Sequence, residues 1–273
     1  MLTVILGILV GLALGLTGSG GSLFAVPLLI YVLHIQPQTA TTISLAAISV
    51  VAAFGAVEAG LNKMIEWRAS LFFLIGGIVA APVGVRIADR LDGSTLITGF
   101  GVLMVLIALS MWYRAIRLPE QLSVVRVNFL RQRDEQNAIC QLSDDRKLTL
   151  AAPCTVVLIV TGAVTGLLSG LFGVGGGFLI VPALIFITDI GINRAVATSL
   201  AIITLVGLSG VLSAIGQGRT LDIVVLALFI LGGIIGMLLG RLLARQIPAL
   251  LLQKIFSVFI LLIALLTLTT RLS

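Results

Sequence analysis

Residues 18–27 read GSGGSLFAVP, and this stretch interrupts an apolar segment that runs from residue 2 to residue 33. It holds three glycines within four positions, Gly18, Gly20 and Gly21. Each glycine in a helix costs about 1 kcal/mol relative to alanine and leaves its peptide groups exposed. We therefore predict that a helix entering from the N-terminal side breaks here.

The composition places this break in a membrane. The chain has 273 residues, of which 59% are hydrophobic and 10% charged, and its mean hydropathy is +1.23. Average soluble proteins are about half apolar and a quarter charged, so we predict an integral membrane protein. In lipid, an unpaired backbone N–H or C=O costs several kcal/mol unless protein or a water-lined cavity receives it. A break at membrane depth therefore indicates a buried site.

The break occurs twice, because residues 173–182 read GVGGGFLIVP. The two copies align Gly18, Gly20, Gly21 and Pro27 with Gly173, Gly175, Gly176 and Pro182. The similarity continues through three pairs of apolar segments: 39–59 with 194–214, 69–87 with 224–243, and 96–113 with 250–270. We predict an all-α, polytopic membrane protein with two homologous repeats, residues 1–113 and 151–273, joined by a charged linker at 114–150.

Two features predict how each repeat begins. Glycines recur every four residues before each break, at Gly7, Gly11 and Gly15 and at Gly162, Gly166 and Gly170. Such stripes let another helix approach closely. After the first break, residues 23–33 extend only about 16 Å as a helix, too short for a hydrocarbon core of about 30 Å. This segment is therefore expected to be a half-helix.

The charges favour a re-entrant half-helix, which makes the two repeats inverted. In that threading thirteen of the 17 lysines and arginines lie on the side of the linker. If residues 2–33 cross the membrane once, the repeats are parallel and the division is eleven to six. Since positive charge accumulates on the cytoplasmic side, we predict a cytoplasmic linker and both termini outside.

Inverted repeats bring the two breaks together near the midplane, where secondary transporters bind their substrates at discontinuous helices. The free N–H groups at the start of each returning half-helix favour an anion. Hydroxyl groups from the breaks and from the neighbouring spans extend the polar lining. The predicted substrate-binding residues are Gly18, Ser19, Gly20, Gly21, Ser22, Thr41, Ser44, Gly173, Gly175, Gly176, Gly177, Thr198 and Ser199. The alternative is that the glycines only permit tight helix crossing.

Glu58, toward the end of its span, is the candidate for proton coupling, because an intramembrane carboxylate is costly and usually functional. The alternative is an interfacial residue partnered by Lys63. Enzymatic interpretations fail: residues 207–210 read GLSG, but a nucleophilic serine needs a histidine base, and the one histidine, His34, lies in a short connection. Neither glycine run is a nucleotide motif. We predict no enzyme, cofactor or metal, and no binding of nucleic acid.

The two breaks, the segments TATTISLA (39–46) and RAVATSLA (194–201) and the loop GLNKMIEW (60–67) together resemble the TauE/SafE family of membrane transporters, also called sulfite exporters. The resemblance covers both halves of the chain. It implies transport of small sulfur-containing anions such as sulfite, sulfoacetate or other organosulfonates across a bacterial inner membrane. Ser22 departs from the pattern, since the second copy has Gly177 there.

We therefore expect a multi-pass secondary transporter whose partners are a small anion and the lipid bilayer, with a homodimer left open. Two alternatives remain. An uncoupled anion channel differs in that its flux neither saturates nor runs uphill on a proton or sodium gradient. A membrane scaffold or sensor would act through the linker, so deleting residues 120–145 would abolish its function.

Overall fold

The computed structural model describes residues 1–18, 20–117, 152–188, 190–219 and 221–244, and in addition 255, 257, 258, 260–262 and 264. Most of the predicted linker and most of the predicted last span, 250–270, lie outside these residues, as does the predicted site residue Ser19.

The described chain is helical throughout and contains no strand. Its elements, in order, are α1 (Leu2–Thr17), the 3-10 helix η1 (Gly20–Phe24), α2 (Ala25–Leu33), α3 (Pro37–Leu61), α4 (Trp67–Arg90), α5 (Gly93–Arg117), α7 (Ala152–Phe172), α8 (Gly177–Thr188), α9 (Ile192–Gly216) and α10 (Ile223–Ala244). Within this part of the chain six helices, α3, α4, α5, α7, α9 and α10, are long and apolar enough to cross a membrane. The fold is thus all-α and multi-pass.

Local sequence signals account for several helix ends. Pro37 occupies the first turn of α3, where its missing N–H has no helical partner to lose. The Asp222 carboxylate accepts hydrogen bonds from the amides of Val224 and Val225, at 3.0 and 3.1 Å, and so caps α10. The long helices begin and end within three residues of the predicted spans, except that α5 continues to Arg117.

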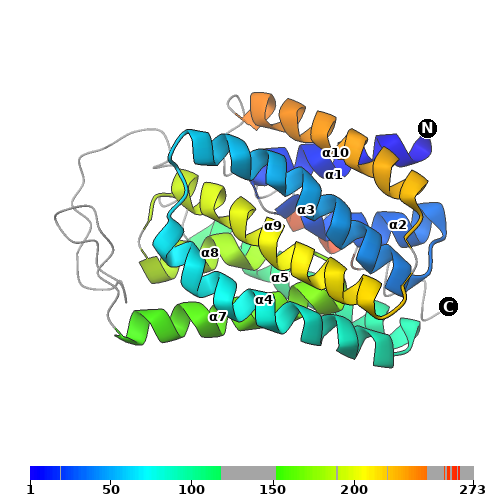
Figure 1. Cartoon of the computed structure of the whole chain (residues 1–273). Coiled ribbons are helices and arrows are strands. Elements are labelled where there is room, and N and C mark those ends of the chain that lie inside the picture. The colour runs from blue at the N-terminus through cyan, green and yellow to red at the C-terminus, as the bar shows by residue number, and fades with distance from the viewer. Residues whose placement is uncertain are drawn as a thin grey trace.

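The long helices are arranged around a central pair (Figure 1). Helices α3 and α9 lie side by side through the middle, with α1 and α10 on one side of them and α4 and α7 on the other. Within the apolar stretch of each helix, 72% of the residues are buried in α3 and 67% in α9, against 33% in α10. The short helices α2 and α8 pack against α3 and α9, respectively. The centre of the molecule is therefore where α3 and α9 meet.

Glycine stripes bring the outer helices into backbone contact. A Cβ atom on Gly7, Gly11 or Gly15 of α1 would meet the carbonyl oxygen of Phe229, Gly233 or Met237 of α10, respectively. On the opposite side, a Cβ atom on Gly162, Gly166 or Gly170 of α7 would meet the carbonyl oxygen of Phe73, Gly77 or Ala81 of α4. These contacts confirm the close helix approach predicted from the stripes. The first helix of each half packs on a helix of the other half.

Large apolar side chains cover the outside of these helices. Val79 of α4, Leu212 of α9 and Leu242 of α10 are 69%, 69% and 62% exposed. A soluble protein rarely exposes a contiguous apolar surface of this extent. The surface is suited to contact with lipid chains.

Candidate functional site

The chain reverses direction between α7 and α8, and we call residues 173–177 the second break. Gly173, Gly175 and Gly176 have φ angles of 70°, 72° and 69°. This left-handed conformation costs a residue with a Cβ atom about 1–2 kcal/mol, which explains why glycine stands at all three positions. The whole segment is buried.

The second break leaves several amides without a partner. The Gly173 N–H donates to the Ser169 carbonyl at 2.8 Å, and the Leu179 and Ile180 N–H groups donate to the Gly176 carbonyl at 3.0 and 3.2 Å. Among the described residues no acceptor is found for the amides of residues 175–178. Consecutive free amides at a helix N-terminus carry positive partial charge and form an anion-binding concavity.

The first break, residues 18–22, has a different backbone. Gly18 ends α1 with a φ angle of 71° and donates to the Leu14 carbonyl at 2.7 Å. The chain then forms η1, which contains Gly20, Gly21 and Ser22, before α2 begins at Ala25. The predicted half-helix at 23–33 therefore starts two residues later than expected, after a 3-10 turn.

The two breaks lie close together beside the central helices. Helix η1 contacts α8. A Cβ atom on Gly175 would lie 3.1 Å from Ile48 Cγ2 of α3 and 3.2 Å from Ile203 Cγ2 of α9. Both isoleucines are almost fully buried. Gly175 therefore sits where α3 and α9 meet, at the centre of the molecule.

The predicted hydroxyl groups of α3 lie near the second break. The Ser44 Oγ donates to the Gly173 carbonyl at 2.8 Å, in a buried hydrogen bond between residues of the two halves. The backbone of Thr41 lies directly against Gly173, while the Thr41 hydroxyl donates to the Gln38 carbonyl at 2.8 Å. The Ser44 hydroxyl thereby fixes one end of the second break to α3.

The predicted hydroxyl groups of α9 are engaged elsewhere. The Ser199 Oγ donates to the Val196 carbonyl within its own helix at 2.8 Å. The Thr198 Oγ1 accepts a hydrogen bond from the Glu66 amide at 3.0 Å, at the connection between α3 and α4. It is the side chain of Val196 that lies against Gly18. The structure thus brings Thr41 and Ser44 to a break, whereas Thr198 and Ser199 bond to other backbone groups.

Ion pairs join helix ends on both sides of the centre. Glu58 of α3 pairs with Arg241 of α10 rather than with Lys63. Arg194 lies 3.4 Å from Glu66 at the same end. At the opposite end Arg219, whose side chain is only 11% exposed, lies 2.5 Å from Asp89 of α4. The Arg219 guanidinium also donates to the Gln38 carbonyl and to the Thr42 hydroxyl of α3, at 3.0 and 2.7 Å.

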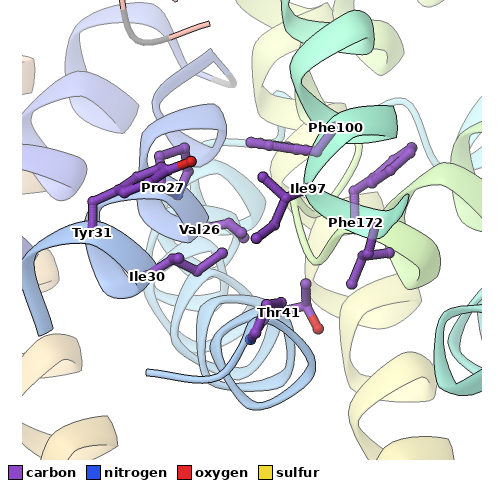
Figure 2. A pocket seen from close by; sticks show the side chains of 10 residues that line it. Val26, Pro27, Ile30, Tyr31, Thr41, Ile97, Phe100 and Phe172 are labelled. Carbon is purple, nitrogen blue, oxygen red and sulfur yellow. The ribbon is translucent and has the colours of Figure 1, made fainter. Parts of the chain in front are cut away.

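An apolar pocket borders the second break (Figure 2). Figure 2 shows side chains of α2 on one side and of α5 on the other, with Thr41 below them. The pocket is lined by Val26, Pro27, Ile30, Tyr31, Pro37, Thr41, Leu96, Ile97, Phe100 and Phe172. Phe172 is the residue directly before Gly173, and its ring centroid lies 5.7 Å from that of Phe100. The pocket therefore reaches the end of α7, where the chain reverses.

Sequence reasoning missed two residues that the structure brings forward. Ser169 of α7 lies beside Gly176, fully buried, and its hydroxyl has no hydrogen-bond partner among the described residues. Arg219 connects α3, α4 and the end of α9. For Ser169, the available signal was the position of a serine one turn before a glycine break. The sequence held no such signal for Arg219, because its partners lie more than 100 residues away.

Comparison with known proteins places the chain in a family. The family model described as sulfite exporter TauE/SafE matches residues 3–267. A probable membrane transporter protein of Xylella fastidiosa is 34% identical over 263 residues, which cover 94% of this chain and 90% of the relative. The probable membrane transporter protein YunE of Bacillus subtilis is 27% identical, with 96% and 95% covered. No solved structure shows significant similarity. The chain belongs to the TauE/SafE family of membrane transporters.

Proposed function

We propose that this protein is a secondary transporter of small anions, of the sulfur-containing class that includes sulfite and organosulfonates, and that the anion binds between the two breaks. The observation that carries the proposal is the run of amides at residues 175–178, buried at the centre of the molecule without an acceptor in the described chain. An anion supplies acceptors to such donors. The sulfur preference follows from the name of the family model.

Equivalent contacts in the two halves support inverted repeats. Adding 155 to a residue number of the first helices, or 156 to one of α4, gives its counterpart in the second half. The contact of Gly232 with Val4 then corresponds to that of Gly76 with Ile159. The other corresponding contacts are Gly240–Leu12 with Gly84–Leu167, Gly7–Phe229 with Gly162–Phe73, Gly11–Gly233 with Gly166–Gly77, and Gly18–Val196 with Gly173–Thr41.

These pairs follow from a twofold relation that exchanges the halves. Figure 1 shows α2 returning to the end of the molecule where the chain begins, while α8 returns to the opposite end, where α7 starts. Two half-helices that enter from opposite ends are the arrangement of inverted repeats in transporters. We infer that each half contributes one re-entrant half-helix to a site near the midplane.

We further infer that the protein lies in a bacterial inner membrane with the α3–α4 connection in the cytoplasm. Lys63, Arg194 and Arg241 lie at that end, which agrees with the excess of positive charge on the cytoplasmic side of membrane proteins. In right-side-out vesicles, with Cys140 and Cys154 replaced by serine, an impermeant maleimide is expected to label Asp92→Cys but not Asn62→Cys. Both positions are exposed. The reverse pattern would overturn the orientation.

Uptake into proteoliposomes tests the function. Radiolabelled sulfite uptake by the purified protein is expected to saturate with concentration and to run uphill when a proton or sodium gradient is imposed. Sulfoacetate and chloride serve as competitors, and only the former is expected to compete. Flux that never saturates and follows the anion gradient alone would identify a channel instead.

Glu58 is our candidate for coupling within the same assay. Its carboxylate faces Arg241 across the α3–α10 contact, so a proton exchanged there would change the pairing of the two helices. Glu58→Gln is expected to retain sulfite exchange between the two sides but to lose uphill uptake driven by a proton gradient. Glu66→Gln, which removes the carboxylate of the neighbouring Arg194 pair, is the matched control and is expected to retain both.

A further inference from the structure

We propose that the two breaks do not contribute equally to the site between them: the second break supplies most of the hydrogen bonds to the anion, and Ser169 of α7 adds a hydroxyl hydrogen bond. The inference rests on the proposed transport of an anion and adds to it the side of the site and a contact residue. It is carried by the side chain of Ser169 and by a comparison of the two breaks, position by position.

The Ser169 hydroxyl is the unsatisfied group of the site. Ser169 is 1% exposed, and its Oγ has no hydrogen-bond partner in the described chain. The neighbouring hydroxyl of Thr165, one turn earlier, is satisfied by the carbonyls of Thr161 and Gly162 at 2.9 and 3.0 Å. Buried hydroxyl groups are almost always paired. The exception at Ser169 is explained if a ligand supplies the acceptor.

Ser169 faces the free amides across the chain reversal. The Cβ atom of Ser169 lies 3.6 Å from the position that a Cβ atom on Gly176 would take. Gly176 is in the middle of the run of amides that lack an acceptor in the described chain, residues 175–178. The side chain of Ser169 and the amides at the start of α8 therefore lie next to each other, and both are hydrogen-bond donors without an acceptor in the described chain.

Space at this position differs between the two breaks. A Cβ atom on Gly176 would find its nearest neighbour, the Thr165 carbonyl oxygen, 3.1 Å away. A Cβ atom on the corresponding Gly21 would fall on the backbone of Leu14. The first break is thus packed more closely against the backbone of α1 than the second is against the backbone of α7.

The first break also lacks a hydroxyl group at the position that corresponds to Ser169. Leu14 stands at the position that corresponds to Ser169, and it is buried in an apolar cluster with Val51 and Met237. The segment that corresponds to the free amides of the second break forms the 3-10 helix over Gly20–Phe24, so its later amides are bonded within that helix. The first break therefore supports the fold, and the binding groups gather on one side of the twofold relation.

The donor set defines the ligand class. A hydroxyl and several N–H groups around one position suit an oxyanion whose oxygens carry lone pairs and no hydrogen, because every contact is then a donor meeting an acceptor. The fully ionised sulfite or sulfonate group fits this description, with three oxygens for the separate donors. A halide is a single atom and cannot place a separate acceptor atom opposite each donor. The site is therefore expected to prefer the oxyanion.

Binding measurements on the full chain in lipid nanodiscs test the inference, with sulfite as the anaerobic probe in titration calorimetry. Ser169→Ala is expected to raise the Kd for sulfite at least about tenfold, a loss typical of a hydrogen bond to a charged group. Ser169→Thr keeps a hydroxyl and is expected to bind within a few-fold of wild type. Ser70→Ala removes another buried hydroxyl that has no partner in the described chain, on α4 and outside the two breaks, and should leave the Kd within about twofold.

Thermal melting separates a ligand contact from a structural role. Because the Ser169 hydroxyl has no partner in the described chain, Ser169→Ala is expected to melt at the wild-type temperature or above it. Wild-type affinity in Ser169→Ala, or equal losses in Ser169→Ala and Ser70→Ala, would overturn the inference while sulfite transport by the wild type still stood. Absence of saturable sulfite binding and uptake in the wild type would overturn the proposed function and the inference together.

Discussion

Gly175→Ala is expected to lower the initial rate of sulfite uptake at least about tenfold, the effect of losing about 1.4 kcal/mol of interaction with the anion, because the added methyl group displaces the amides of the second break. Gly175 has a φ angle of 72°. Its new Cβ atom would lie 3.1 and 3.2 Å from the methyl groups of Ile48 and Ile203, two side chains held by the central helix pair. The break must shift, and its amides shift with it.

The control for this variant is Gly218→Ala. Gly218 also has a left-handed φ angle, 81°, but no atom lies within 4 Å of its Cβ position. It therefore carries the same backbone strain without the contact, and uptake by Gly218→Ala is expected to equal that of the wild type. Melting curves in detergent show whether each variant is folded. Wild-type uptake by Gly175→Ala would remove the second break from the transport site.

Gly11→Ala is expected to destabilise the fold. Its Cβ atom would meet the Gly233 carbonyl oxygen and would lie 2.7 Å from both the Cα and the carbonyl carbon of Gly233. Backbone atoms cannot rotate away, so α1 and α10 must separate along their contact. Overpacking of this kind costs about 1–3 kcal/mol and occasionally more, and the variant should melt several degrees lower or aggregate.

The twofold relation makes the same prediction for the other half. Gly166→Ala would place a Cβ atom against the carbonyl oxygen of Gly77 in the contact of α7 with α4, so its loss of thermal stability should be similar. Gly99→Ala is the control, since its Cβ atom would only touch the Phe172 ring at 3.6 Å. Size-exclusion chromatography and thermal melting give the comparison. Melting of Gly11→Ala at the wild-type temperature would contradict the packing described for α1 and α10.

The partners in the ion pairs could not be predicted from the sequence. The alternative interpretation of Glu58 paired it with Lys63, which lies close along the chain, but its partner is Arg241, 183 residues away. The salt bridge of Arg219 with Asp89 likewise joins residues 130 apart. Such pairs depend on which helix ends meet. A single chain without its fold offers many cations for each carboxylate, so the choice cannot be made from spacing.

The backbone conformations of the two breaks could not be predicted from the sequence either. The sequence treats residues 18–22 and 173–177 as two copies, since their glycines align. Their backbones differ in conformation: the first contains a 3-10 helix over Gly20–Phe24, and the second contains three left-handed glycines. Both conformations are open to glycine, so the local sequence leaves the choice between them undetermined.

The sequence alone determined the helical membrane class, the extents of most of the long helices and the glycine stripes, because apolar length and glycine content act within a few residues of the chain. The tertiary structure alone decided that α1 packs on α10 and α7 on α4, that Glu58 meets Arg241, and that the Ser169 hydroxyl lies buried beside Gly176. These contacts involve residues that are distant in sequence or that differ between the aligned copies. They depend on close packing between helices, which decides which side chain fits beside which backbone.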